Sequence, residues 1–469
     1  MSRSVIDGGA LALADAASEG LGSVGPVNEP ERAGIPRILV IGGGYVGMYT
    51  ALRLQRRLRR HEAAITVVSP QSYMTYQPFL PEAAAGSLEP RHVVVPLRRV
   101  LRGCRVLSGA VTRIEHARRA VHFEPIEGPS TEIGYELLVI AVGSVSKVLP
   151  IPGLAEVGIG FKTVAEAIWL RNHVLARIDA AASTADVAVR RRALTFVVVG
   201  GGYAGVEALA ELEDMARYAV RFAKPLTASD LRWVLVEATG RILPEVSEGL
   251  GAYTLDRLRE RQIEIHLETR VTSVEGGRVV LDDGTDFATD TLIWTAGVRP
   301  HPLLTVSDLP CDESGRVRCT AALSVDGVDG VWAAGDCASV PDLTRPGALC
   351  APNAQHAVRQ ARRLADNVVA TVRGGRPEPY RHAYVGSVAS LGLHKGVAEV
   401  YGVRLKGWPA WFMHRTYHMT RMPTLNRKAR VVLDWTLALF FRRETVSLGA
   451  FAEPRAEFVA ASGLSGRAP

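Results

Sequence analysis

VVVGGGYAGVE, residues 197–207, joins an apolar run of valines to a glycine-rich loop and the start of a helix. Its glycines follow the spacing Gly200-x-Gly202-x-x-Gly205. The first glycine permits a tight turn, the second lets the backbone approach a pyrophosphate, and the third lets the helix pack closely on the strand. The N-terminus of the helix then faces the negative charge of the phosphates. This stretch therefore predicts a βαβ unit that binds a dinucleotide.

The same construction occurs earlier in the chain, in ILVIGGGYVGM, residues 38–48. Its glycines are Gly42, Gly44 and Gly47, and the next apolar strand, AAITVVS, ends at Ser69. One such loop would be weak evidence, because glycine turns also precede helices where no ligand binds. Two loops, each between a valine-rich strand and a helix, are much harder to explain by packing alone. The repeat predicts an α/β chain with two Rossmann-like dinucleotide-binding domains.

The residue that ends the second strand differs between the two units. In the later unit the strand LRWVLVE ends at Glu237, whose carboxylate can accept hydrogen bonds from both ribose hydroxyls of NADH. A 2′-phosphate would be repelled there, so NADH is favoured over NADPH. The corresponding residue in the earlier unit is Ser69, whose hydroxyl contacts a ribose more weakly. Glu237 could also be an ordinary solvated acid, but its position at the strand end favours the binding role.

Length and composition limit the class of protein. The chain has 469 residues, too many for one ordinary core, and its 47% hydrophobic and 22% charged residues are typical of a globular protein. Its five cysteines form no C-x-x-C pair: Cys104, Cys311, Cys319, Cys337 and Cys350. They argue against a structural zinc site, a disulfide framework and a dithiol redox pair, so no metal is expected. A reducing compartment is the simplest interpretation.

Three further motifs, AVG at 141–143, TAG at 295–297 and AAGDCA at 333–338, follow apolar strands. With the two glycine loops they resemble the flavoprotein reductases that have two dinucleotide-binding domains. The resemblance implies FAD in the first domain, bound by Gly42, Gly44, Gly47, Ser69, Gly143, Gly335 and Asp336. It implies NADH in the second domain, bound by Gly200, Gly202, Gly205, Glu237 and Gly297.

Three longer segments are similar to type II NADH dehydrogenases, which are single-subunit NADH:quinone oxidoreductases of membrane surfaces. They are YMTYQPFLPEAAAG at 73–86, NAQHAVRQARRLADN at 353–367 and the region from GSVASLGLHKGVAEV to KGWPAWFMHRTYHM at 386–419. The resemblance implies Glu207 near the nicotinamide and isoalloxazine, Gln355 where flavin meets quinone, and Lys395 beside the flavin. The quinone side would consist of Gln355, Arg359 and Gln360, although the family has a glutamine at the position of Arg359.

These motifs predict an FAD domain that is interrupted by an NADH domain. The expected order is a flexible extension at 1–36, the FAD domain at 37–153 and 291–385, the NADH domain at 154–290, a C-terminal amphipathic helical membrane-association region at 386–450 and a flexible tail at 451–469. The extension contains Asp7, Asp15 and Glu19 and lacks a basic start followed by an apolar run. A secretory signal is therefore not expected.

The positive charge of the chain is concentrated near its C-terminus. Residues 404–443 contain nine Lys and Arg and a single acid, Asp434, whereas the whole chain has a net charge of +7. The same region contains Trp408, Trp411, Phe412, Tyr417, Trp435, Phe440 and Phe441. On a helix, Trp408, Trp411 and Phe412 would share one side, and an aromatic side with basic flanks is typical of helices in a bilayer interface. The run VVLDWTLALFF at 431–441 has eleven residues, too few to span a bilayer.

The main hypothesis is a peripheral enzyme on the cytoplasmic face of the cell membrane. It would be an FAD-dependent NADH:quinone oxidoreductase that uses menaquinone or ubiquinone, binds the anionic membrane surface and pumps no protons. The alternatives are a soluble NADH-dependent reductase of a protein electron carrier and a redox-sensing protein that binds FAD and NADH. A sulfide:quinone reductase has only Cys350 in its favour. Nucleic acid would explain the basic tail but not the redox fold, and a homodimer stays open.

Overall fold

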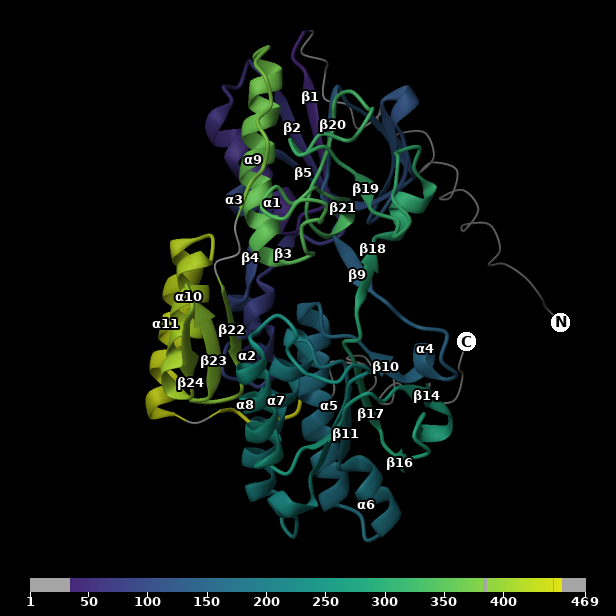
Figure 1. Ribbon diagram of the computed structural model, residues 1–469, viewed down its shortest axis with the longest axis vertical. Helices are drawn as coiled ribbons and strands as arrows, with labels where there is room; N and C mark the ends of the chain where they lie inside the picture. The colour runs from purple at the N-terminus through teal and green to yellow at the C-terminus, as the bar shows by residue number, and fades with distance from the viewer. Residues whose placement is uncertain (1–33, 383–385, 442, 449–469) are drawn as a thin grey trace, which may run out of the picture. The chain divides into compact units, whose positions relative to one another are not determined.

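The computed structural model describes residues 34–382, 386–441 and 443–448 (Figure 1). These residues form two compact units, each assembled from separate stretches of the chain. Among the described residues, unit 1 contains 34–72, 101–143 and 301–380, and unit 2 contains 73–100, 144–300 and the part from 381 to 448. Most of the expected extension at 1–36 and all of the expected tail at 451–469 lie outside the described residues.

Unit 1 is built on a seven-stranded sheet with the order β20-β8-β1-β2-β5-β6-β7. Its strands are β1 (Arg37–Ile41), β2 (Ala64–Ser69), β5 (Arg105–Glu115), β6 (Ala120–Pro125), β7 (Thr131–Gly134), β8 (Leu137–Ile140) and β20 (Val331–Ala333). The strands from β20 to β5 pair in parallel, and β5, β6 and β7 continue as an antiparallel meander. The parallel strands are runs of Ile, Leu and Val because a parallel sheet is normally covered on both faces.

Two long helices of unit 1 pack against each other, α1 (Tyr45–Arg57) and α9 (Ala354–Val372) (Figure 1). The Thr50 hydroxyl donates to the carbonyl oxygen of Ala361 at 3.3 Å, and the Arg53 guanidinium donates to both carboxylate oxygens of Asp366 at 2.7 Å. These bonds join residues about 310 positions apart and fix the late helix beside the first glycine loop. The shorter elements are η3 (His116–Arg118), η7 (Pro302–Val306), β19 (Val317–Arg318), η8 (Gly335–Cys337) and β21 (Ala338–Ser339).

Unit 2 contains a second parallel sheet, with the order β10-β17-β11-β12-β13. Its strands are β10 (Gly158–Ile159), β11 (Thr195–Val199), β12 (Arg232–Val236), β13 (Glu264–His266) and β17 (Thr291–Trp294). The helices of this region are α4 (Leu154–Val157), α5 (Val164–Ala182), α6 (Val187–Ala193), α7 (Tyr203–Ala219) and α8 (Glu248–Arg259). The two parallel sheets confirm the predicted α/β fold with two Rossmann-like cores, whereas the predicted domain limits stay a prediction.

Shorter pieces complete this part of unit 2. An antiparallel sheet is formed by β14 (Val271–Ser273), β15 (Arg278–Leu281) and β16 (Asp286–Ala288), and a two-stranded ribbon by β9 (Ser144–Ser146) and β18 (Val298–Pro300). Single turns are η4 (Val220–Phe222), η5 (Ala228–Asp230) and η6 (Glu275–Gly277). A hairpin turn that contains Gly284 joins β15 to β16.

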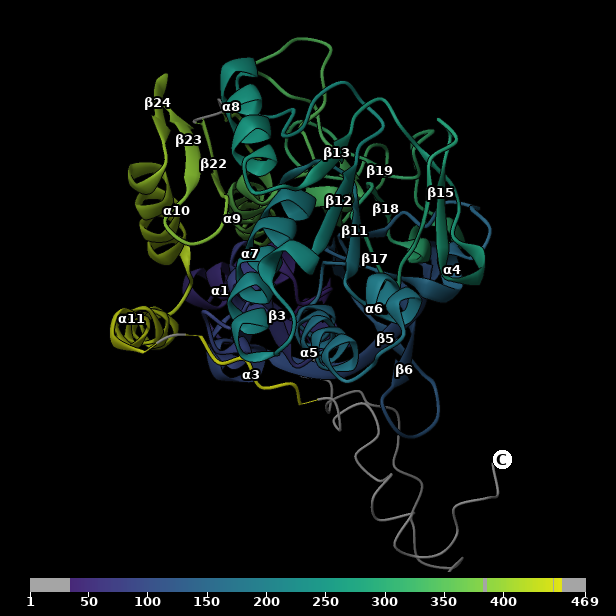
Figure 2. The same cartoon turned by 90° about the horizontal axis from the view of Figure 1, so that it is seen from below.

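The C-terminal part of unit 2 is only partly helical. It begins with an antiparallel sheet, β22 (Gly386–Ser390), β23 (Gly396–Val400) and β24 (Val403–Lys406), and continues with α10 (Trp408–Arg421) and α11 (Leu425–Phe440) (Figure 2). The segment 73–100 belongs to the same unit and forms β3 (Tyr73–Thr75), η1 (Gln77–Phe79), α2 (Leu80–Ala84), η2 (Pro90–His92), β4 (Val94–Pro96) and α3 (Leu97–Val100). The helix α2 packs on α5 and α7, and α10 packs on β22 and β23.

Candidate functional site

The glycine loop of unit 2 connects β11 to α7. Gly200 has a φ of +111°, and a Cβ there would lie 2.7 Å from Oγ1 of Thr295. A Cβ on Gly205 would lie 1.9 Å from the carbonyl oxygen of Gly200, so only glycine allows this helix–strand approach. In contrast, a Cβ on Gly202 would meet nothing within 4 Å. The first and third glycines are required by packing, and the second faces open space, as a pyrophosphate-binding loop requires.

The glycine loop of unit 1 connects β1 to α1 and repeats this geometry. Gly42 has a φ of +107°, and a Cβ there would lie 2.3 Å from the carbonyl oxygen of Ala141. A Cβ on Gly47 would lie 1.8 Å from the carbonyl oxygen of Gly42, while one on Gly44 would meet nothing within 4 Å. Gly44 also caps α1 without a side-chain hydrogen bond, and the first turn carries no acid. The N-terminal amides of α1 are therefore suited to a phosphate.

Glu237 follows β12 and lies against the glycine loop of its own unit. Its Oε2 accepts a hydrogen bond from the backbone N–H of Gly201 at 2.6 Å. Its Oε1 accepts from the backbone N–H and from the hydroxyl of Thr239, both at 2.8 Å. These bonds hold the carboxylate at the carboxyl end of the strand next to the loop. In unit 1 the same place is taken by Ser69, which is buried at the end of β2.

Two other predicted glycines lie at the carboxyl ends of the strands that pair with the first strand of each unit. Gly143 follows β8, which pairs with β1, and Gly297 follows β17, which pairs with β11. Both have positive φ, +67° and +90°, and a Cβ on either would meet nothing within 4 Å. Ligands of open parallel sheets bind outside the carboxyl ends of the strands. In each unit the predicted glycines therefore gather at the edge where that binding is expected.

Gly335 and Asp336 lie at the same edge of the unit 1 sheet, after β20. The backbone N–H of Gly335 donates to Oε1 of Gln360 at 2.8 Å, and the Gln360 side chain is buried on α9. A Cβ on Gly335 would lie 2.7 Å from Cγ2 of Val46 on α1. Gln360, which the resemblance assigned to the quinone side, thus fixes the turn that presents Asp336. The open glycines, the uncapped helix and this turn fit an adenine dinucleotide in unit 1.

A comparison with known families agrees with this geometry. The family model described as pyridine nucleotide-disulphide oxidoreductase matches residues 36–361. The type II NADH:quinone oxidoreductase Ndh of Mycobacterium tuberculosis is 30% identical to this chain over 93% of the chain and 95% of that relative. The chain belongs to the type II NADH:quinone oxidoreductase family. A relative of the same description from Staphylococcus aureus is 30% identical over 81% of this chain and 93% of its own length.

A solved structure supports the fold independently of close sequence similarity. NDH2 from Plasmodium falciparum in complex with NADH has a TM-score of 0.81 and covers 88% of this chain and 99% of its own. Its sequence identity is 18%, so this likeness concerns the fold alone.

In this member of the family, Glu207 belongs to a buried polar cluster. It lies on α7, and its Oε1 accepts from the backbone N–H of Ser390 at 2.8 Å and lies 3.1 Å from Nε2 of His414. One turn later, Glu211 accepts from the Ser390 hydroxyl at 3.0 Å and pairs with Arg443 at 3.2 Å. Burial raises the pKa of Glu211, and the positive charge of Arg443 opposes that rise.

Sequence reasoning found Glu207 but missed its partners. Ser390 lies 183 positions after Glu207, and Arg443 lies 232 positions after its own partner Glu211. Nothing in the local sequence of Ser390, His414 or Arg443 shows that they meet α7. The spacing of Glu207 and Glu211 is a signal that was available. Two acids one turn apart on an otherwise apolar helix face indicate buried carboxylates that need partners.

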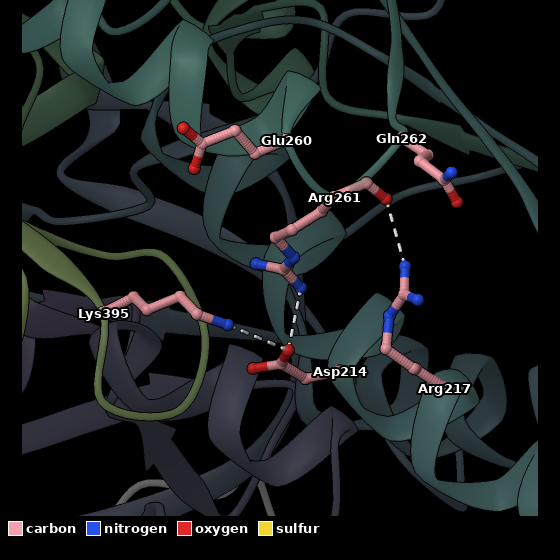
Figure 3. Close-up of a pocket in the computed structure, with 6 residues that line it drawn as sticks. All are labelled: Asp214, Arg217, Glu260, Arg261, Gln262 and Lys395. Atoms are coloured by element: carbon pink, nitrogen blue, oxygen red, sulfur yellow. Dashed lines mark hydrogen bonds and ion pairs between the residues drawn. The ribbon is translucent and has the colours of Figure 1, made fainter.

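Lys395 lines a cavity of about 240 Å³ together with Asp214, Arg217, Glu260, Arg261 and Gln262 (Figure 3). Its Nζ lies 3.7 Å from Oδ1 of Asp214, which also accepts from Nη2 of Arg261 at 3.0 Å. The Lys395 side chain is 46% exposed. The loop that carries it is held to α7, because Oδ2 of Asp214 accepts from the backbone N–H of Leu393 at 2.6 Å. The proposed position of Lys395 beside the flavin stays a prediction.

Gln355 and Arg359 lie one turn apart at the start of α9. The Asn353 side chain caps this helix by accepting from the backbone N–H of His356 at 2.9 Å. Nη1 of Arg359 donates to the carbonyl oxygen of Gln355 at 3.1 Å, which turns the guanidinium back toward the helix start. The structure therefore brings these two residues together, and their contact with an acceptor stays a prediction.

The C-terminal helices are attached to unit 2 by a buried ion pair. Glu82 of α2 accepts from Nη2 of Arg415 at 2.8 Å and from the indole N–H of Trp435 at 2.9 Å. The Arg415 guanidinium also stacks over Trp411 at 4.1 Å. The prediction that Trp408, Trp411 and Phe412 form one exposed side of α10 is therefore partly wrong. Trp411 is only 7% exposed, whereas Trp408 and Phe412 are 55% and 51% exposed. Trp411 is buried because α10 packs on β22 and β23, and its ring lies between the Arg415 guanidinium and the ring of His394.

All five cysteines lie in the described part of the chain, and none forms a disulfide. Burial raises the pKa of the Cys350 thiol to about 11, which lowers its thiolate fraction near neutral pH. None of the helices described here combines the length and the apolar character needed to cross a bilayer.

Proposed function

We propose that this chain catalyses the reaction for which its family is named, the oxidation of NADH coupled to the reduction of a quinone. The observation that carries this proposal is the pair of glycine loops with the same geometry, only one of which is followed by a carboxylate at its edge. One site then suits a permanently bound cofactor, and the other suits an exchanging substrate that is selected by its ribose.

FAD would bind in unit 1, against Gly42, Gly44, Gly47, Ser69, Gly143, Gly335 and Asp336. When bound, FAD accepts a hydride from NADH and passes two electrons on to the acceptor. The residues of this chain supply the surroundings for that chemistry. The N-terminal amides of α1 face the pyrophosphate, and Gln360 holds the Gly335 turn so that Asp336 keeps its position.

NADH would bind in unit 2, against Gly200, Gly202, Gly205, Glu237 and Gly297. In the structure Oε2 of Glu237 accepts one hydrogen bond, from the N–H of Gly201, and Oε1 accepts two, from Thr239. A ribose hydroxyl would donate to the remaining acceptor position on Oε2, because each ionised oxygen has about two lone-pair sites. A 2′-phosphate would meet the same negative charge, so the chain is proposed to prefer NADH over NADPH.

The acceptor is proposed to be a membrane quinone, menaquinone or ubiquinone. Gln355, Arg359 and Gln360 are proposed on the quinone side of the flavin. Glu207 and Lys395 are proposed on the nicotinamide and flavin side. Stopped-flow measurements separate the two half-reactions, the reduction of the enzyme by NADH and its reoxidation by a quinone. Replacing Gln355 by Leu should slow reoxidation of the reduced enzyme by a soluble quinone about tenfold or more and leave reduction by NADH within threefold. Equal slowing of both steps would contradict the assignment of Gln355.

Binding to an anionic membrane surface, on the cytoplasmic face of the cell membrane, is part of the same proposal. It is supported by exposed apolar side chains on the C-terminal helices: Trp408, Phe412, Leu425, Leu433, Leu437, Leu439, Phe440 and Phe441. Arg427, Lys428 and Arg430 lie on α11 beside them. A homodimer and the absence of proton pumping also stay proposals.

Sedimentation with vesicles tests the membrane assignment. Replacing Arg427, Lys428 and Arg430 by Gln should remove about 3 kcal/mol of attraction to vesicles that contain phosphatidylglycerol. High salt should have the same effect on the unmodified protein, because exposed charges are screened. Absence of binding at low salt would favour a soluble reductase of a protein electron carrier.

A further inference from the structure

Unit 2 contains a second cavity, of about 360 Å³, whose lining is almost entirely cationic. We call it the basic pocket, and its residues are Arg91, His92, Arg99, Asn426, Arg427 and Arg430. They come from η2, α3 and the first two turns of α11, which are far apart in the sequence. Its volume lies at the lower end of the range of roughly 300–1,000 Å³ for small-molecule sites.

Most of the positive charge in the basic pocket has no counter-charge among the residues that the structure describes. Arg99, Arg427 and Arg430 have no carboxylate at ion-pair distance there, and of the arginines that line the pocket Arg91 is paired, with Glu89 at 2.7 Å. Burial lowers the pKa of the Arg427 guanidinium, and the charges of Arg430 and Arg99 lower it further. Like charges held together destabilise one another, and an anion in the pocket would relieve that repulsion.

The polar groups of the pocket are already oriented. Nδ1 of His92 lies 2.6 Å from Oδ2 of Asp434, and Nη1 of Arg430 donates to Nε2 of His92 at 3.3 Å. Asp434 is thereby occupied, and it also accepts from the backbone N–H of Glu89 at 3.2 Å. Nε of Arg430 donates to Oδ1 of Asn426 at 3.4 Å. The guanidinium groups of Arg99 and Arg427 remain for a ligand, and their planar donors match the oxygens of a phosphate.

The helix α11 extends from this pocket with an apolar face that is not covered by the described residues. At 100° per residue, Asn426, Arg430, Leu433, Leu437 and Phe440 lie within about 40° of one line along the helix. The first two line the pocket, and the last three are 61%, 55% and 77% exposed. One face of one helix therefore changes from cationic to apolar along its length. A small free anion would contact only the cationic half of this face.

We propose that the basic pocket binds the phosphate head group of an anionic phospholipid, whose acyl chains lie along the exposed face of α11. This inference rests on the proposed membrane location and goes beyond it. A diffuse attraction between basic residues and a charged surface needs no particular arginine, whereas a built pocket holds one lipid molecule at one place. The pocket residues of the segment 91–99 then contribute to lipid binding as much as those of α11.

Calorimetric titration of the full-length, flavin-loaded protein with dihexanoyl-phosphatidylglycerol, kept below its micelle concentration, tests this. The unmodified protein should bind one molecule saturably. The double variant Arg99→Gln/Arg427→Gln should bind at least about tenfold more weakly, because each lost arginine removes charge-assisted hydrogen bonds. The matched control Arg98→Gln/Arg421→Gln removes the same charge from α3 and α10, outside the pocket, and should stay within threefold of the unmodified protein.

Two further titrations identify the ligand class. Dihexanoyl-phosphatidylcholine and inorganic phosphate should each bind at least about tenfold more weakly, because one lacks the net charge and the other lacks the chains. Equal losses in both double variants, equal binding of inorganic phosphate, or no saturable binding at all would each overturn the proposal. Turnover of the unmodified protein with NADH and a water-soluble quinone, without lipid, tests the proposed function separately.

Discussion

The two glycine loops have the same backbone geometry and different side-chain surroundings. Gly42 and Gly200 have φ angles of +107° and +111°, and the third glycine of each loop approaches the carbonyl oxygen of the first in the same way. The strand that follows ends in a buried Ser69 in unit 1, but in unit 2 it ends in Glu237, bonded to the loop itself. Glycine spacing therefore specifies that a pyrophosphate can approach, and the strand-end side chain specifies which ribose is accepted.

The largest effect should come from the third glycine of each loop, because its Cβ would overlap a backbone oxygen that cannot move independently. Overpacking of this kind costs about 1–3 kcal/mol or more. Gly47→Ala should release FAD during purification, and Gly205→Ala should retain FAD but lose at least about tenfold in reduction by NADH. Flavin absorbance per protein and single-turnover reduction measure the two outcomes. Gly44→Ala and Gly202→Ala, whose Cβ atoms would meet no protein atom within 4 Å, should unfold at the same urea concentration as the unmodified protein and control for folding, not for binding.

Making unit 2 resemble unit 1 at the strand end should have the next largest effect. Glu237→Ser removes the carboxylate, and hydrogen bonds to charged groups contribute about 1.5–3 kcal/mol, so the KM for NADH should rise about tenfold to a hundredfold. The preference for NADH over NADPH should fall in the same variant, and the FAD content should not change. An unchanged KM ratio between NADH and NADPH would show that the selection lies elsewhere.

Acidic pH should destabilise unit 2, because the buried His173 contacts β17, the strand that pairs with β11 beside the glycine loop. Nε2 of His173 lies 2.9 Å from Oγ1 of Thr291 on β17, and its ring stacks on Trp169. Burial, with a smaller contribution from Arg177, lowers the pKa of His173 to about 4.

The sign of this effect follows from the direction of the shift. The unfolded chain takes up a proton at His173 below about pH 6.5, while the folded chain does not until about pH 4. The stabilisation is therefore complete above pH 6.5 and is lost as the pH falls toward 4, by up to about 1.4 kcal/mol per unit. Urea unfolding of the unmodified protein should show this loss, and His173→Gln should show a slope that is smaller by that amount.

The smallest effect should come from Ser69→Ala. A neutral hydroxyl contributes about 0.5–1.5 kcal/mol, so FAD should dissociate only a few-fold faster from this variant. Dialysis against a flavin scavenger measures the rate. A loss as large as that of Gly47→Ala would mean that the strand-end residue matters equally in both units, and the contrast between the two loops would fail.

The sequence by itself determined the first βαβ unit of each parallel sheet, both glycine loops and the position of Glu237. These features depend on neighbours within about 40 residues, on the alternation of apolar strands with turns, and on a spacing of glycines that has a direct steric reason. The same holds for the basic charge of residues 404–443, which is a property of composition.

Only the tertiary structure decided which side chains meet. It placed His414 and Ser390 at Glu207, Gln360 at the turn before Asp336, and Trp411 inside the protein instead of on its surface. It also brought residues 91–99 to α11 and so created the basic pocket. Helical periodicity states which residues share a face, but the burial of that face depends on what packs against it, and those partners lie hundreds of residues away in the chain.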